Sequence, residues 1–154
     1  MLIAKEDYRE IVRDCIDASP YEACGLISGY RVDSGLTVVA NRVYPARNLD
    51  GSATSYRVSP EDQIRIMLDM ENEGFELVGI YHSHPDGRAY PSLTDVEQAF
   101  YPEAVYLIVG MKDGIEVRGY HIENPRLAEV LRNKTRSRLR SVVDVEILVK
   151  DDPA

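Results

Sequence analysis

Hydrophobic and polar positions along the chain divide it into helices and strands joined by short turns. Over residues 5–18 apolar side chains recur every three or four positions, which predicts an amphipathic helix ending at Ser19-Pro20. Apolar runs over 23–29 and 36–44, separated by turn residues, predict two strands. The apolar positions of the helix are Tyr8, Ile11, Val12, Cys15 and Ile16.

A second helix is predicted to begin after Ser59, because a hydroxyl cap is followed by Pro60 and then by acidic residues. We expect it to run to about Asn72. A loop over 48–54 and a strand over 55–58 are expected before it. The side chains that it is expected to bury are Ile64, Met67 and Leu68.

The second half of the chain is richer in strand patterns. Residues 77–81 form a continuous apolar run, and residues 104–111 and 115–122 flank a turn and predict a hairpin. Asn124-Pro125 predicts the start of a last helix, and 142–149 a final strand or docked tail. Helices between mostly hairpin-linked strands predict an α/β or α+β domain. The last helix would carry Leu127, Val130 and Leu131.

The chain has 154 residues, 44% of them hydrophobic, and a formal charge of −8, which fits one domain with its own core. This acidic balance disfavours binding to nucleic acid or to an anionic membrane. No apolar run approaches the roughly 18 residues of a membrane span, and the start lacks the features of a signal peptide. Cys15 and Cys24 make no disulfide framework and favour a reducing, cytoplasmic location.

Two of the three histidines, His82 and His84, follow the apolar run at 77–81. Residues two apart in an extended chain point to the same side, so both imidazoles can face one point. Asp95 lies in the first turn of a short helix that Ser92 is expected to cap. Two imidazoles and one carboxylate, with a fourth position open to water, make up a catalytic zinc site.

Simpler explanations of these residues stay open at this stage. Ser-x-x-Asp is a common helix-capping arrangement, and His-x-His pairs occur by chance. A zinc hydrolase also needs a base that does not bind the metal, and Glu22, at the entry to an apolar strand, is the candidate. Its alternative is a solvent-facing position at the strand's first residue. His121 is expected to be a half-exposed strand residue.

Taken together, Glu22, His82-x-His84-Pro85 and, six residues later, Ser92-x-x-Asp95 resemble the signature of the JAMM (MPN+) metalloproteases, and of their short prokaryotic members in particular. The resemblance spans residues 1–123. It implies an α/β fold, a single MPN (cytidine-deaminase-like) domain with a curved mixed β-sheet flanked by helices. Residues 124–154 are then expected to form a C-terminal helix and strand that pack on or extend the same domain.

The resemblance also implies roles for individual residues. His82, His84 and Asp95 would bind one catalytic Zn²⁺, Glu22 would act as general acid and base, and Ser92 would stabilise the oxyanion or orient the site. The implied activity is cleavage of a peptide or isopeptide bond at the C-terminus of a ubiquitin-like protein. Sulfur-carrier processing and removal of a protein modifier both fit, a non-catalytic MPN scaffold subunit is the alternative, and the oligomeric state is open, a homodimer being one option.

Three segments bear on how far the resemblance extends. Only eight residues, 96–103, precede the next strand, so we expect no insertion carrying ligands for a second zinc. The loop over 45–56 corresponds to a substrate-gripping insertion of the family, or is a plain flexible connection. Residues 126–140 carry a net charge of +5 against −13 for the rest of the chain. A solvated helix face explains such a run by default, and docking of an acidic partner is the alternative.

Overall fold

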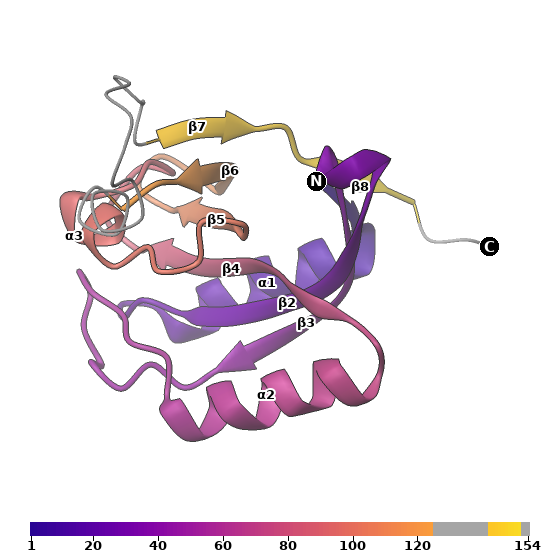
Figure 1. Ribbon diagram of the computed structural model, residues 1–154. Helices are drawn as coiled ribbons and strands as arrows, with labels where there is room; N and C mark the ends of the chain where they lie inside the picture. The colour runs from indigo at the N-terminus through magenta and orange to yellow at the C-terminus, as the bar shows by residue number, and fades with distance from the viewer. Residues whose placement is uncertain (125–141, 152–154) are drawn as a thin grey trace, which may run out of the picture.

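A computed structural model describes residues 1–124 and 142–151 and shows one mixed, eight-stranded sheet with a helix on each face (Figure 1). The strand order is β7-β6-β5-β4-β2-β3-β1-β8. The helices are α1 (Lys5–Ala18), α2 (Pro60–Asn72) and the short α3 (Leu93–Glu97). The strands are β1 (Leu2–Ala4), β2 (Cys24–Val32), β3 (Thr37–Ala46), β4 (Glu76–His84), β5 (Val105–Gly110), β6 (Glu116–Ile122), β7 (Val142–Val145) and β8 (Leu148–Lys150).

Helices α1 and α2 cover opposite faces of the sheet, and each completes its own apolar core (Figure 1). Ile11 of α1 packs in the cluster that contains Tyr81, whereas Ile66 of α2 packs in the cluster that contains Ile80. Adjacent residues of β4 therefore serve different cores, as the alternation of side chains along a strand requires. The expected α/β domain with a curved mixed sheet flanked by helices is confirmed.

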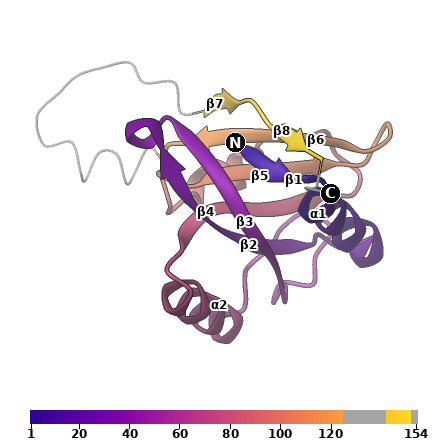
Figure 2. The same cartoon turned by 90° about the vertical axis from the view of Figure 1, so that its right-hand side faces the viewer.

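The two edges of the sheet are joined by one short C-terminal segment. Strand β7 pairs with β6, and β8 pairs with β1, although only residues 146 and 147 separate them. The amide of Leu148 donates to the carbonyl of Met1 at 2.8 Å. The sheet must curl until its edges approach this segment, as Figure 2 shows. The single strand or docked tail expected over 142–149 is thus two strands on opposite edges.

The buried face of α2 differs from the expected one. Ile66 and Met70 are buried, but Ile64 and Leu68 are 62% and 53% exposed and Met67 is only partly buried. Ile64 and Leu68 are four residues apart, and so are Ile66 and Met70. The two pairs therefore have the same helical spacing, and periodicity alone does not show which of the two faces, roughly 200° apart around the helix, is buried.

Polar contacts at the start of α2 set its rotation. The Asp62 carboxylate accepts from the amide of Arg47 at 2.9 Å, and the Gln63 amide donates to the Tyr101 hydroxyl at 2.6 Å. Gln63 lies on the same side of the helix as Ile66 and Met70. The cap itself is as predicted, because the Ser59 hydroxyl accepts from the Asp62 amide.

Other expectations meet the structure in different ways. Residues 55–58 form no strand, because Val58 makes only an isolated bridge with Asn48. The basic run at 126–140 lies outside the described residues, and so does the predicted last helix apart from Asn124 at its start. His121 is half-buried in β6, as expected. No helix among the described residues is long and apolar enough to cross a membrane.

The rotation of α2 gives a test with a built-in control. Ile66→Ala should lower the free energy of unfolding by about 2–5 kcal/mol, because it opens a cavity in the core. Ile64→Ala, the same change two residues away, should stay within about 0.5 kcal/mol. Urea denaturation measures both, and equal losses would mean that α2 does not present this face to the sheet.

Candidate metal centre

The end of β4 brings two imidazoles together. His82 pairs with Cys24 of β2 on one side and with Ile108 of β5 on the other, so the strand is held from both directions. His82 is fully buried and His84 is partly buried. Their Nε2 atoms lie 3.0 Å apart. The strand continues through both histidines, and they point to the same side as the sequence predicts.

Asp95 reaches the same point from α3. Its Oδ1 lies 3.1 Å from His82 Nε2, and its Oδ2 lies 3.2 Å from His84 Nε2. The same carboxylate completes a capping box, since Oδ2 accepts from the Ser92 amide at 2.6 Å while the Ser92 hydroxyl accepts from the Asp95 amide at 3.1 Å. The capping explanation and the ligand explanation of Ser-x-x-Asp are therefore compatible.

The spacing of this His82, His84 and Asp95 cluster suits a small divalent cation. Tetrahedral zinc with ligand bonds of about 2.0–2.1 Å places its ligand atoms about 3.3 Å apart, close to the separations found here. The Nδ1 of His84 lies 2.9 Å from the carbonyl of Arg88, which places a proton on Nδ1 and leaves the Nε2 lone pair facing the cluster. Two nitrogen lone pairs and a carboxylate converging on one point fit a metal ion.

The charges of the cluster also fit. Burial lowers the pKa of His82, which favours the neutral imidazole that binds metals. Burial by itself raises the pKa of Asp95, but hydrogen bonds involving His82, His84 and Ser92 hold that pKa well below its usual range. His84 differs from His82, because burial is outweighed by its contacts with Asp95 and Arg88 and by the charge of Glu22, which raise its pKa. The site thus offers one nitrogen ligand held neutral, His82, and an ionised oxygen ligand, Asp95.

Glu22 lies beside this cluster, two residues before the start of the neighbouring strand β2. Cys24 pairs with His82, so continuing the antiparallel register by two residues places Glu22 opposite His84. Glu22 is only 5% exposed, and its Oε2 has no hydrogen-bond partner among the described residues. Burial, opposed by His84 and assisted by Asp95, raises the pKa of Glu22 to about 7. The solvent-facing alternative for Glu22 is wrong.

Asn48 holds together the loop after β3, a role that the sequence analysis missed. Its side-chain amide donates to the carbonyls of Glu22 and Ser55, at 3.0 and 3.2 Å. Its Oδ1 accepts from the amides of Asp50 and Arg57, both at 3.0 Å. The loop is therefore no plain connection, because it fixes the backbone of Glu22. Only its Asx-type composition hinted at this order.

The same loop carries Tyr56 over the cluster of His82, His84 and Asp95. The Tyr56 ring stacks on the His82 ring, with centroids 4.4 Å apart and planes inclined by 22°. This stacking shields one face of the imidazole. The hydrophobic pattern of the sequence does not single out Tyr56, because an aromatic residue in a loop carries no spacing signal.

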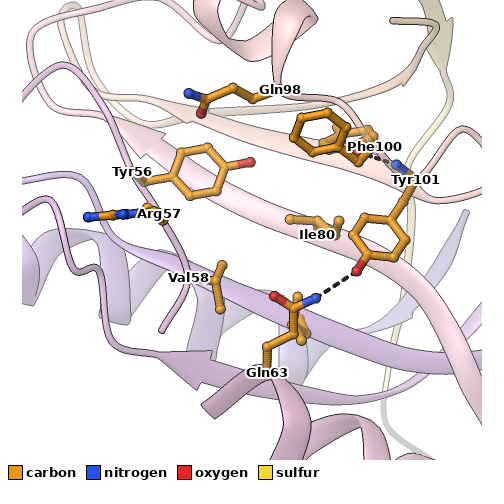
Figure 3. A pocket seen from close by; sticks show the side chains of 10 residues that line it. Tyr56, Arg57, Val58, Gln63, Ile80, Gln98, Phe100 and Tyr101 are labelled. Atoms are coloured by element: carbon orange, nitrogen blue, oxygen red, sulfur yellow. Dashed lines mark hydrogen bonds between the residues drawn. The ribbon is translucent and has the colours of Figure 1, made fainter. Parts of the chain in front are cut away.

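Tyr56 also forms one wall of an open pocket of about 290 Å³ between the sheet and α2 (Figure 3). Gln63 and Tyr101, joined by their hydrogen bond, form another part of the wall. The lining is mainly aromatic and aliphatic, which suits apolar side chains of a bound peptide. The remaining lining residues are Leu26, Arg57, Val58, Ile80, Gln98, Phe100 and Tyr106.

Comparison with known proteins gives a consistent result. A family described as prokaryotic homologs of the JAB domain matches residues 4–121. The CysO-cysteine peptidase of Mycobacterium tuberculosis is 36% identical over 112 residues, covering 71% of this chain and 74% of that protein. The desampylase of Haloferax volcanii is 38% identical over 90 residues, which cover 58% of this chain and 62% of that protein. A probable TtuB-protein conjugate cleaving protease of Thermus thermophilus is 36% identical over 98 residues, covering 63% and 60%.

Solved structures agree on the fold. The solution structure of a protein from Desulfitobacterium hafniense has a TM-score of 0.79 at 29% identity and covers 98% of this chain and 93% of its own. The solution structure of a protein from Salinibacter ruber has a TM-score of 0.68 at 26% identity and covers 97% of this chain and 92% of its own.

The loop contacts predict the effect of removing Asn48. Asn48→Ala should lower the free energy of unfolding by about 1–3 kcal/mol, because it removes the side-chain partner of the Glu22 and Ser55 carbonyls, whose hydrogen bonds with Asn48 are partly buried. Asn41→Ala, on an exposed position of β3, should change it by no more than about 0.5 kcal/mol. Both are measured by thermal or urea denaturation, and matching losses would exclude an organising role for Asn48.

Proposed function

Since the chain belongs to the family of prokaryotic homologs of the JAB domain, we propose that it is a zinc-dependent peptidase or isopeptidase that cleaves at the C-terminus of a ubiquitin-like protein. The observation that carries the proposal is the convergence of His82, His84 and Asp95 beside the buried Glu22. The names of the relatives, a CysO-cysteine peptidase and a TtuB-protein conjugate cleaving protease, support the same class of substrate.

In this proposal His82, His84 and Asp95 hold the metal ion through the three atoms that face one another. A bound zinc ion would lower the pKa of water to about 7 and polarise the scissile carbonyl. The hydrogen bond from His84 Nδ1 to Arg88 and the capping box around Asp95 keep two of these ligands oriented.

Glu22 transfers the proton. It accepts a proton from the attacking water and delivers it to the nitrogen that leaves, which requires a carboxyl group near the reacting atoms that is not itself a ligand. A pKa raised by burial to about 7 lets the side chain both accept and donate a proton near neutral pH. Its place opposite His84 supports this role.

Ser92 supports the site in two ways. Its oxygen accepts from the Asp95 amide and so fixes the ligand helix. Its hydroxyl hydrogen remains available to donate to the oxyanion that develops on the scissile carbonyl, a contribution of about 3 kcal/mol in comparable sites.

The pocket beside Tyr56 is assigned to the C-terminal tail of the modifier. The pocket adjoins the cluster of His82, His84 and Asp95, because Tyr56 lines the pocket and stacks on the His82 ring. Its apolar lining would bury side chains that precede the scissile bond, which positions the carbonyl. A scaffold function finds less support, because a scaffold has no need for a complete ligand set beside a buried Glu22.

Metal binding is tested by comparing histidine variants. Wild-type protein should retain about one zinc per chain, and zinc at 100 times its dissociation constant should raise stability by about 2.7 kcal/mol. His82→Ala should lose the metal and this stabilisation. His121→Ala removes the one histidine away from the site and serves as the matched control. Metal analysis and thermal unfolding give the readout, and equal zinc content in all three proteins would contradict the proposed ligands.

Catalysis is tested with Glu22→Gln. This variant should keep its zinc but lose about 10²–10⁴-fold in kcat, because proton transfer is removed while the ligands remain. The substrates are CysO-cysteine and a TtuB–protein conjugate, and Glu116→Gln on the hairpin is the matched control. Chelated wild-type protein should be inactive. Equal cleavage by wild type, Glu22→Gln and chelated protein would overturn the mechanism.

A further inference from the structure

The carboxyl group of Glu22 depends on its main chain for its position. Its Oε2 has no hydrogen-bond partner among the described residues, so no neighbouring side chain anchors that atom. A general base acts only when it lies within hydrogen-bond reach of the proton that it takes. The peptide groups next to the Glu22 Cα atom therefore decide whether the carboxyl group stands in the right place.

The peptide group that joins Glu22 to Ala23 is held from both sides. Its carbonyl oxygen, that of Glu22, accepts from the Asn48 side chain at 3.0 Å. Its amide, that of Ala23, donates to the hydroxyl oxygen of Ser83 at 2.8 Å. The first bond ties the peptide group to the loop after β3. The second ties it to β4, the strand that carries both histidines of the cluster.

Ser83 takes the place of a main-chain acceptor. It stands between His82 and His84, and because side chains alternate along a strand, it points to the opposite face of the sheet. Its amide donates to the Ala23 carbonyl at 3.1 Å. In a regular antiparallel pair the two residues would exchange both bonds through their main chains. Here a hydroxyl group supplies one of the two acceptors, one residue before β2 begins.

The Ser83 hydroxyl is fixed in its own orientation. Ser83 is fully buried, and it interacts with Cys15 of α1. Burial raises the pKa of Cys15 to about 12, and a hydrogen bond with Ser83 opposes this rise. Such a bond stabilises the thiolate only when the serine donates to the sulfur. The hydroxyl hydrogen of Ser83 is therefore directed to Cys15, and its oxygen is left to accept from Ala23.

We propose that Ser83 is a positioning residue for catalysis, because its hydroxyl fixes the peptide group between Glu22 and Ala23 and so holds the Glu22 carboxyl group beside the metal ligands. One short segment of β4 then sets the positions of both the ligands and the acid. The inference rests on the proposed function, in which Glu22 transfers the proton. Ser83 itself contacts neither the metal nor the substrate in this scheme.

The first test compares two buried serines in the zinc-loaded full chain. The substrate is CysO-cysteine or the TtuB–protein conjugate, whichever the wild-type protein cleaves. Ser83→Ala should lower kcat by about 10–100-fold, because a displaced catalytic group loses rate steeply. KM should stay within about twofold, since substrate contacts are unchanged. The variant should still bind about one zinc per chain.

Ser28→Ala is the matched control. Ser28 is also fully buried, and its hydroxyl donates to the Arg42 carbonyl at 3.5 Å, within the pairing of β2 with β3. This variant loses a buried serine hydroxyl as well, so it reports on the general cost to the fold. Its kcat should equal that of the wild-type protein.

A double-mutant cycle shows whether Ser83 acts through Glu22. In the Glu22→Gln background, followed in single turnovers with excess enzyme, Ser83→Ala should change the rate by less than about twofold, because no acid remains to be positioned. An equal loss in both backgrounds would mean that Ser83 acts on the histidines or on the fold, and it would overturn the proposal.

A second pair of variants tests the hydroxyl at nearly constant volume. Ser83→Thr keeps the acceptor for the Ala23 amide, whereas Ser83→Val has a methyl group in its place. The kcat of the threonine variant should exceed that of the valine variant at least about tenfold. This pair decides the question if Ser83→Ala does not fold, and equal kcat values would contradict the role of the hydroxyl.

The outcomes separate this inference from the proposed function. Wild-type kcat in Ser83→Ala, or loss of zinc from that variant, overturns the positioning role while the peptidase function stands. If the zinc-loaded wild-type protein cleaves neither conjugate, the proposed function fails and the positioning role fails with it.

Discussion

The pairing of β2 with β4 is the constraint on which the whole site depends. It sets Cys24 against His82 and so brings Glu22 opposite His84. A shift of this strand register by one residue would turn every side chain of β2 to the other face of the sheet. It would also move Glu22 away from the proposed metal ligands. Gly25 protects the register, because a Cβ at this position would lie 2.2 Å from Cε1 of Tyr81 and 2.6 Å from the carbonyl oxygen of Tyr44.

The site is built at a cost to stability. Glu22 Oε2 and His82 Nδ1 are buried without hydrogen-bond partners among the described residues, and such atoms are normally paired. A core designed only for stability would replace them with apolar groups. The surrounding sheet, with its two separate apolar clusters, provides the stability that tolerates these unpaired atoms.

The parts of the molecule that the sequence predicts best are those fixed by neighbours in the chain. The spacing of His82 and His84 at a strand end, and the cap at Ser92, depend on local geometry and appear as expected. The face of α2 that is buried depends on Gln63 reaching Tyr101, far away in the sequence, and was predicted wrongly. The order of the loop after β3 depends on four hydrogen bonds of Asn48, which no periodic pattern records. Tertiary contacts of this kind override local propensity.

The segment that carries β7 and β8 has a consequence for how the chain folds. Strand β2, which follows Glu22, pairs with β4, which carries His82 and His84, within the first 84 residues, whereas β8 must find β1 across nearly the full length of the chain. Such distant contacts form slowly, because a long loop must be closed first. Until then both β1 and β6 present open edges to other chains, and these are the places where a nascent copy is most exposed to aggregation. One short segment therefore protects both edges at once.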